Sequence, residues 1–327
     1  MNEVSTIGVF TSGGDAPGMN ACIRSVVRTA SLRGYPIKGI RRGYEGMIDG
    51  DIVDLDGFAV SSIIQTGGTI LKSARSDRFL SEEGRQKAAE QIQNAGIDGL
   101  IAIGGDGTLT GALVFHEEHH IPCVACPGTI DNDLFGTDET IGFDTAINTA
   151  LASIDRIRDT ADAHNRLFLI EVMGRDSGFI AAHSGLAGGA EMVLIPETDT
   201  DISEVKTRIH KLMTEHRRSS IVVVAEGDEL GGARDIADAM RADEKFNDIE
   251  LRVCILGHTQ RGGAPTARDR VLASRLGKAA VDALLSGEHG VMAGVLNNEL
   301  VLTPFDVIRS QKKTINREII QLNEIIS

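Results

Sequence analysis

Continuous runs of apolar residues, each followed by a glycine-rich polar turn, constrain this chain of 327 residues more than any other feature. The segments between one turn and the next run have mostly helical patterns. Continuous rather than alternating apolar runs are typical of parallel strands that are covered on both faces. The pattern predicts repeated strand–helix–strand units with right-handed crossovers. The runs comprise residues 7–10, 100–103, 121–126, 167–172, 221–225 and 253–256.

Composition narrows the class of protein. Hydrophobic residues make up 42% of the chain but aromatic residues only 4%, so aliphatic side chains must fill the cores. The net charge of −14 argues against a nucleic-acid-binding protein, which usually has a basic face. No apolar run reaches the roughly 18–20 residues of a membrane span. The first residues lack the basic region of a signal peptide, so we expect a cytoplasmic α/β enzyme.

The four cysteines include one C-x-x-C pair, Cys123 and Cys126. A redox or zinc site is one interpretation, but a single pair without a second pair is a weak signal. Both residues lie in an apolar run that reads as a buried strand. We therefore expect them to be small core residues.

The first glycine-rich turn, residues 11–20, lies between a predicted strand and a predicted helix and reads TSGGDAPGMN. Its glycines allow backbone N–H groups to approach a phosphate, and the helix N-terminus favours negative charge. The turn matches neither the P-loop nor the dinucleotide-binding motif. Taken alone it is also compatible with an ordinary tight turn.

The second and third turns add carboxylates. Residues 104–108 read GGDGT, in which Asp106 is suited to Mg²⁺ beside a nucleotide phosphate. Residues 127–133 read PGTIDND, which places two carboxylates, Asp131 and Asp133, beside a threonine. Phosphoryl transfer to an alcohol needs a carboxylate that accepts the hydroxyl proton. The alternative for the third turn is a purely structural Asx-turn.

The fourth and fifth turns each place an arginine among glycines after a buried strand. They are residues 173–178, with Arg175, and residues 257–263, with Arg261. Arginine binds phosphate through two parallel hydrogen bonds, so this setting favours an anion site. Because ligands bind beyond the carboxyl ends of strands in open α/β sheets, we expect the five turns to converge on one or two clefts.

In this order and at these spacings, the five turns resemble those of the bacterial ATP-dependent 6-phosphofructokinases. The matching segments read TSGGDAPGMN, GGDGT, PGTIDND, EVMGR and LGHTQRGG, and the resemblance extends from about residue 5 to residue 305. It implies a glycolytic phosphotransferase that makes fructose 1,6-bisphosphate from D-fructose 6-phosphate, with Mg-ATP as the phosphoryl donor.

The resemblance also implies a catalytic set. Asp131 corresponds to the base that takes the proton from the sugar 1-hydroxyl, and Thr129 and Asp133 to neighbours that position the γ-phosphoryl group and Mg²⁺. Arg175 corresponds to the cation that stabilises the transferring group, and Asp106 to the magnesium-linked carboxylate. Gly14 belongs to both the catalytic and the nucleotide sets. The implied nucleotide site comprises Gly14, Tyr44, Arg75, Gly105, Asp106, Gly107 and Thr108.

The implied sugar-phosphate site draws on two subunits. In the family, the residues matching Arg166 and Arg252 reach the sugar 6-phosphate from a neighbouring subunit, which implies an oligomer, typically a homotetramer. Without the resemblance, His258 reads equally well as a hydrogen-bonded core histidine. The implied substrate-binding residues are Thr129, Asp131, Arg166, Met173, Gly174, Arg175, Glu226, Arg252, His258 and Arg261.

Alternatives differ in donor or class. Pyrophosphate-dependent relatives tend to carry Asp at the position of Gly107 and Lys at that of Gly128, so ATP is favoured here. A GGDG kinase acting on lipid or NAD would leave the fourth and fifth turns unexplained. A silent regulatory subunit should lack one of the acidic residues, yet Asp106, Asp131 and Asp133 are all present.

Two regions depart from the family pattern. Many members have an aromatic residue at the position of Ser76 and a second nucleotide-binding arginine at that of Leu80. We expect Arg78 to take the place of that arginine. Gly57, Glu215 and Ser219 replace basic residues and a common histidine near the allosteric site. We therefore expect a weak or altered response to phosphoenolpyruvate. The residues that match the effector site for ADP or phosphoenolpyruvate are Arg24, Arg28, Ser61, Arg158, Gly189, Glu191 and Arg217.

The predicted architecture has two three-layer α/β/α domains, each with a mainly parallel sheet. The ATP- and magnesium-binding domain is expected to hold residues 1–142 and 255–305. The sugar-phosphate domain is expected to hold residues 143–254 and 306–327. The helical spacing of residues 308–326 predicts a helix that closes the fold.

Overall fold

The structure, a computed structural model, describes residues 4–163, 166–215 and 220–326 and divides into two compact units. Unit 1 comprises residues 1–145 and 261–313, and unit 2 comprises residues 146–260 and 314–327. The chain therefore passes between the units three times. Each unit carries its own sheet and its own hydrophobic core.

Unit 1 contains, within the described residues, a seven-stranded sheet whose central strands are parallel. Antiparallel pairing occurs at its two edges, between β2 and β3 and between β10 and β11. The strands, in order across the sheet, are β11 (Glu299–Pro304), β10 (Val291–Leu296), β5 (Cys123–Pro127), β4 (Gly99–Gly104), β1 (Ile7–Thr11), β2 (Ile37–Ile40) and β3 (Ile52–Leu55).

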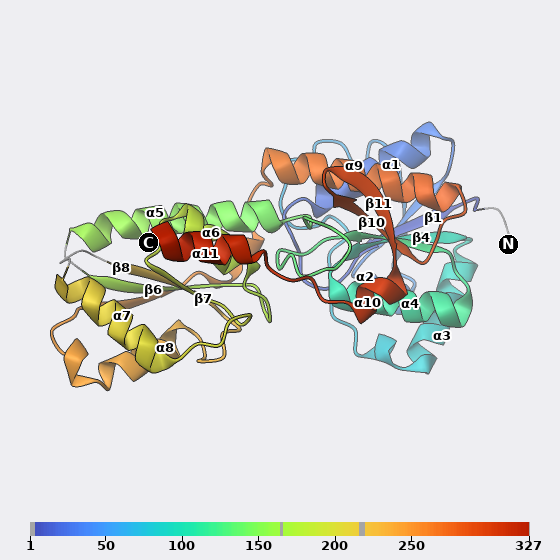
Figure 1. Cartoon of the computed structure of the whole chain (residues 1–327). Coiled ribbons are helices and arrows are strands. Elements are labelled where there is room, and N and C mark those ends of the chain that lie inside the picture. The colour runs from blue at the N-terminus through green and yellow to red at the C-terminus, as the bar shows by residue number, and fades with distance from the viewer. Residues whose placement is uncertain (1–3, 164–165, 216–219, 327) are drawn as a thin grey trace. The chain divides into compact units, whose positions relative to one another are not determined.

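Helices cover both faces of this sheet (Figure 1). Helices α1 (Met19–Leu32) and α9 (Ala267–Leu285) pack together on one face. On the other face, the rings of Phe10, Tyr44, Phe79 and Phe115 follow one another through the core, with 3.9 Å between the stacked rings of Tyr44 and Phe79. That face is covered by α2 (Gly43–Asp49), η1 (Arg78–Leu80), α3 (Glu82–Asn94), α4 (Asp106–His119) and α10 (Phe305–Ser310).

Unit 2 repeats this plan around a fully parallel sheet of four described strands. Helices α5, α6 and α11 lie on one face of it, and α7 and α8 on the other (Figure 1). The strands, in order across the sheet, are β7 (Met192–Leu194), β8 (Ser220–Ala225), β6 (Leu167–Val172) and β9 (Leu251–Ile255). The helices are α5 (Phe143–Asp162), α6 (Phe179–Ala187), α7 (Ile202–Glu215), α8 (Ala233–Arg241), η2 (Glu244–Phe246), η3 (Gly257–Arg261) and α11 (Arg317–Ile326).

The predicted α/β class, with two mainly parallel sheets sandwiched by helices, is confirmed. All six predicted runs contain strands. The prediction of one helix over residues 308–326 was wrong, because residues 311–316 are not helical and separate α10 from α11. Within that break the ammonium of Lys313 donates to the backbone carbonyl of Asp138, a contact that holds the segment to unit 1.

The borders between the units fall three to eight residues later in the chain than the predicted ones. Hydrogen bonds account for these shifts. At the second border the Leu256 N–H donates to the carbonyl of Glu171 over 3.0 Å, which holds the chain after β9 to unit 2. The residues that end unit 1 at the other two borders are held to unit 1. The backbone N–H of Thr145 donates to the carboxylate of Asp269 over 2.8 Å, and the Arg261 guanidinium donates to the carbonyl of Asp15. Lys313 is held in the same way by Asp138, so all three crossing points are fastened to unit 1.

All four cysteines lie in the described part of the chain and carry free thiols. Cys123 and Cys126 are buried, and burial raises the pKa of the Cys123 thiol to about 12. The prediction of small core residues is therefore confirmed. No helix among residues 4–163, 166–215 and 220–326 is both long and apolar enough to span a bilayer.

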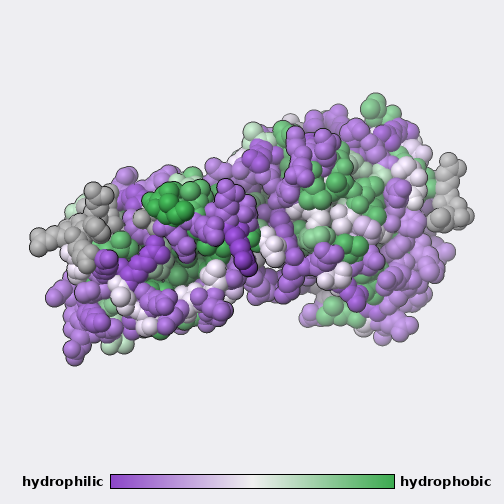
Figure 2. Space-filling model, viewed as in Figure 1, coloured by the Kyte–Doolittle hydropathy of each residue, from purple (hydrophilic) through white to green (hydrophobic). Residues whose placement is uncertain are grey.

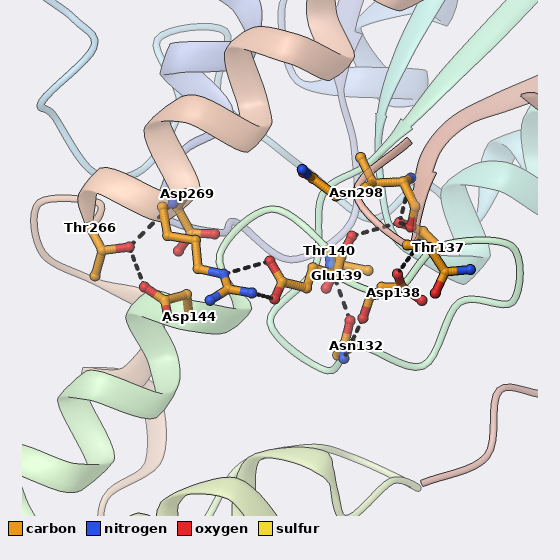
Figure 3. Close-up of polar contacts among 12 residues, drawn as sticks. Asn132, Thr137, Asp138, Glu139, Thr140, Asp144, Thr266, Asp269 and Asn298 are labelled. Atoms are coloured by element: carbon orange, nitrogen blue, oxygen red, sulfur yellow. Dashed lines mark hydrogen bonds and ion pairs between the residues drawn. The ribbon is translucent and has the colours of Figure 1, made fainter. Parts of the chain in front are cut away.

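Among the side chains that form these contacts, Asp269 is the most buried, with 1% of its surface exposed. Its carboxylate accepts from the backbone N–H of Gly142 over 2.9 Å and from both the N–H and the hydroxyl of Thr145. Figure 3 shows Thr266, the N-cap of α9, bridging Asp269 and Asp144. Burial raises the pKa of Asp269 to about 6. The folded protein therefore holds this proton more tightly than the unfolded chain does.

We predict that Asp269→Asn lowers the free energy of unfolding by about 1–3 kcal/mol, because an amide cannot accept from all three donors. Because the pKa of Asp269 is higher in the folded protein, its protonation adds to the free energy of unfolding. This contribution is fully present below about pH 4 and is lost as pH rises through about 6. The loss in the variant should thus be about 1 kcal/mol larger at pH 5 than at pH 7.5. Urea unfolding at both pH values measures it, with the exposed Asp54→Asn as control. Equal losses at the two pH values would contradict the assignment.

Candidate active site

The first three glycine-rich turns follow β1, β4 and β5, which are adjacent parallel strands of unit 1. Their carboxyl ends therefore lie at one edge of the sheet. The turns are joined there by backbone hydrogen bonds, from Ser12 N–H to the carbonyl of Ile103 over 3.1 Å and from Gly128 N–H to that of Gly104 over 2.9 Å. The first three turns therefore lie together at one sheet edge, as their positions after strands predicted.

Glycine is required at Gly104 by close packing. A Cβ atom there would lie 2.3 Å from the hydroxyl oxygen of Thr108 and 2.7 Å from the carbonyl oxygen of Ser12. At Gly107, in the first turn of α4, a Cβ atom would meet nothing within 4 Å. The surface around Gly107 is therefore open, and beside it the carboxylate of Asp106 is exposed at the helix N-terminus. Open backbone at a helix N-terminus is suited to a phosphate.

The first turn lies against an arginine from a distant part of the sequence. The Nη1 atom of Arg261 donates to the carbonyl of Asp15 over 3.2 Å, and a Cβ atom on Gly14 would lie 2.6 Å from the same nitrogen. Gly13 has a positive φ of 80°, and Ser73 hydrogen-bonds its carbonyl. Arg261 thus adds positive charge to the turn that carries Gly14.

The third turn is buried although it is polar. Thr129, Asp131 and Asn132 are 6%, 7% and 3% exposed. The Asp131 N–H donates to the Thr129 hydroxyl over 3.2 Å, and the Thr140 hydroxyl donates to the Thr129 carbonyl over 2.6 Å. Asn132 has a left-handed backbone with a φ of 55°. A carboxylate held in such a turn has the fixed position that a general base requires.

The residues expected at the nucleotide differ in their exposure. Arg75 is exposed, whereas Tyr44 is buried and its hydroxyl donates to the carbonyl of Thr108 over 2.6 Å. Tyr44 therefore supports the second turn from within the core. Arg78, the suggested substitute for a missing arginine, forms ion pairs with Glu45 at 3.2 Å and with Asp49 at 2.7 Å.

In unit 2, Met173, Gly174 and Arg175 follow β6, and Glu226 follows the adjacent parallel strand β8. The carboxylate of Glu226 accepts from the Arg175 N–H over 2.8 Å. This bond supports a left-handed backbone at Arg175, with a φ of 56°, and leaves its side chain exposed. His258 lies in η3 beyond the end of β9, which borders β6 on its other side, so these residues share one sheet edge.

Arg166 and Arg252 lie at the opposite edge of that sheet. Arg166 directly precedes β6. Arg252, in β9, is the strand partner of Phe168, the second residue of β6. Arg166 forms an ion pair with Glu250 at 2.9 Å, and Arg252 contacts the same carboxylate. The length of β6, about 20 Å, separates them from Met173. One small ligand therefore cannot contact both sets from the same chain.

The residues expected at an effector site form two groups, one in each unit. In unit 2, Arg158 donates to the carbonyls of Gly188 and Gly189 and pairs with Glu191 at 3.3 Å. In unit 1, the Ser61 hydroxyl donates to the carbonyl of Gly57. Arg24 and Arg28 lie on α1 of the same unit. A Cβ atom on Gly57 would lie 3.6 Å from the guanidinium of Arg28. Arg217 and Ser219 fall outside the described residues.

Lys313 was not identified from the sequence, although its ammonium contacts the turn of Asp131. It donates to the side-chain oxygen of Asn132 over 2.9 Å. Burial lowers the pKa of Lys313 to about 8, against the nearby charges of Asp138, Asp133 and Glu139, which raise it. No local pattern could reveal it, because 181 residues separate the two partners.

We predict opposite effects for alanine at two neighbouring glycines. Gly104→Ala should lower the free energy of unfolding by about 2–4 kcal/mol, because the new Cβ atom overlaps Thr108 and Ser12. Gly107→Ala should raise it by about 0.4–1 kcal/mol, because the site is open and the unfolded chain loses freedom. Urea unfolding of the two variants and of the unmodified chain measures both changes in the free energy of unfolding. A destabilised Gly107→Ala variant would show that the turn is more tightly packed than described.

The sequence matches the family described as "Phosphofructokinase" over residues 6–284. It is 57% identical to "ATP-dependent 6-phosphofructokinase 1" of Thermus thermophilus over 321 residues, 98% of this chain and 99% of that protein. It is 56% identical to the "ATP-dependent 6-phosphofructokinase" of Cytophaga hutchinsonii over 318 residues, 97% of this chain and 96% of that protein.

Solved structures agree. The phosphofructokinase of Saccharomyces cerevisiae superposes with a TM-score of 0.88 at 35% identity and covers 94% of this chain. This chain spans 45% of the yeast chain. With the five turns in place at the ends of their strands, these matches show that the chain belongs to the phosphofructokinase family.

Proposed function

We propose that this chain transfers the γ-phosphoryl group of ATP to the 1-hydroxyl of D-fructose 6-phosphate, forming fructose 1,6-bisphosphate and ADP in glycolysis. The main support is the buried turn that carries Asp131 beside the open glycine turn of Gly107, at one edge of the unit 1 sheet. The third turn, with Asp131, holds a position for a base, and the second turn, with Gly107, has backbone suited to phosphates.

In this reaction Asp131 accepts the proton of the sugar hydroxyl as its oxygen attacks the γ-phosphorus. Thr129 and Asp133 position the transferring group, and the N–H groups near Gly14 and Gly105 contact the donor phosphates. Arg175 offsets the developing negative charge. The substrate contacts of Met173, Gly174, Glu226, His258 and Arg261 and the nucleotide contacts of Tyr44, Arg75 and Thr108 are part of the same proposal.

Mg²⁺ fits the residues present. Asp106 offers an exposed carboxylate beside the open backbone of Gly107, and Mg²⁺ is usually bound by one or two carboxylates together with substrate phosphates. Among the described residues, no group of three or more acidic, histidine or cysteine side chains forms a metal cage. When bound, Mg²⁺ would neutralise charge on the donor phosphates.

We further propose a cytoplasmic homotetramer in which Arg166 and Arg252 bind the sugar 6-phosphate of a neighbouring subunit. The two arginines lie at the sheet edge opposite Met173, which supports their binding a ligand of another subunit. Figure 2 shows a hydrophobic patch at the C-terminal end of α11, where Leu322, Ile325 and Ile326 are 42%, 77% and 60% exposed. Such a patch is suited to contact with a second copy. The groups around Arg158 and Arg28 are proposed as the effector site.

The donor argument rests mainly on Gly107. At Gly128 a Cβ atom would lie 3.0 Å from Ile103 and 3.1 Å from Met19, so packing alone already favours glycine there. Gly107 has no such restriction within 4 Å.

We predict that Gly107→Asp lowers kcat/KM for ATP at least ~10-fold, because the added carboxylate extends into open space and repels a donor phosphate. The fold should remain intact, and Gly107→Ala should retain ATP turnover. Coupled assays of ADP and fructose 1,6-bisphosphate formation, run in parallel with pyrophosphate, measure both donors. Unchanged ATP kinetics in Gly107→Asp would refute the donor argument. Turnover of the unmodified chain only with pyrophosphate would show that Gly107 does not decide the donor.

We predict that Asp131→Ser lowers kcat by roughly 10²–10⁴-fold while ATP still binds, because only the proton acceptor is removed. Steady-state assays and equilibrium nucleotide binding separate the two effects. Asp306→Asn, at an exposed position in α10, is the control and should retain turnover. If Asp131→Ser kept full turnover, Asp131 would not be the base.

A further inference from the structure

Lys313 is the last residue of unit 1 before the chain enters unit 2 for the final time. It lies in the non-helical segment between α10 and α11. Its ammonium donates to the side-chain oxygen of Asn132 over 2.9 Å and to the carbonyl of Asp138 over 2.7 Å. One cation thus bridges the turn of Asp131 and the loop that follows it.

Asn132 has contacts on both ends of its amide. Its oxygen also accepts from the Thr140 N–H over 3.0 Å, and its nitrogen donates to the Asp138 carbonyl over 3.3 Å. Figure 3 shows this side chain pointing between Asp138 and Thr140. Lys313 completes the set, so the amide is held by one charged and two neutral groups. Hydrogen bonds that involve a charged group are roughly twice as strong as neutral ones.

The backbone at Asn132 needs such support. Its φ of 55° is a left-handed conformation, and it stands between Asp131 and Asp133. Non-glycine residues held there cost of order 1–3 kcal/mol and persist only where their surroundings fix them. Because Asn132 is adjacent to both carboxylates, a relaxed backbone at this residue would move both. A displacement of about 1 Å in catalytic groups can lower a rate 10²-fold.

We propose that Lys313 is a positioning residue for phosphoryl transfer, holding Asn132 so that the left-handed turn presents Asp131 in its reactive position. This inference rests on the proposed role of Asp131 as the base. Lys313 acts through Asn132 and does not itself contact the substrate. Its charge is favoured by Asp133, Asp138 and Glu139, and the charge of Glu139 is itself paired with Arg268.

The first test compares Lys313→Met with Lys312→Met, whose side chain is the exposed neighbour. Lys313→Met should lower kcat at least ~10-fold with KM for both substrates changed less than ~3-fold, because geometry rather than binding is lost. Lys312→Met should match the unmodified enzyme. Lys313→Arg, whose fork reaches two acceptors, should restore much of kcat. A folded Lys313→Met variant with unchanged kcat, or one that raises only KM, would overturn the proposal.

The second test asks whether Lys313 acts through Asn132. In a double-mutant cycle, Lys313→Met should lower kcat little further in an Asn132→Ala background. Losses that multiply would overturn the assignment, because Lys313 would then act by another route. Lys313→Gln, which keeps a hydrogen-bond donor, replaces Lys313→Met if that variant does not fold. Loss of turnover in Asp131→Ser together with full turnover in Lys313→Met would overturn the role of Lys313 alone, whereas full turnover in Asp131→Ser would overturn that of the base.

Discussion

The segment from Asn132 to Thr145 is held by side chains from distant parts of the sequence, and these contacts fix the chain between the turn of Asp131 and the first passage between the units. Asp269 binds its end through the N–H groups of Gly142 and Thr145. Arg268 pairs with Glu139 in the middle, and Lys313 binds its start at Asn132. The same segment follows β5 and leads into α5 (Figure 3). A single stretch, which begins directly after the candidate base Asp131, thus leads to one of the three passages between the units.

Both units place candidate site residues in the turns that follow adjacent parallel strands. Parallel strands end side by side, and the turns that follow them expose backbone and charged side chains at one edge. In unit 1 the turn residues include glycines where a Cβ atom would overlap a neighbour, as at Gly104. In unit 2 the corresponding strain falls on Arg175, whose backbone is stabilised by the carboxylate of Glu226. Buried strands provide the rigid frame in each case.

The sequence predicted the features that depend on local pattern. The buried central strands and the turns after them were found because their residues are continuous and apolar or rich in glycine. Strands such as β3, which has only four residues, and β11, which is largely exposed, carry no such signal and were missed. The break between α10 and α11 was also missed, because it is stabilised by Lys313 and Asp138, 175 residues apart. Asp269 was missed for the same reason, since its partner Gly142 lies 127 residues away.

The two arginines beside Glu250 have a further consequence. Because the length of a strand separates Arg166 from Met173, a complete set of ligand contacts requires a second molecule under the proposed assembly. Specific activity would then follow the law of mass action for subunit association, falling when the protein is diluted below its dissociation constant. Any solute that strengthens association would activate the enzyme without touching its catalytic residues. Protein concentration itself becomes a regulator of the reaction.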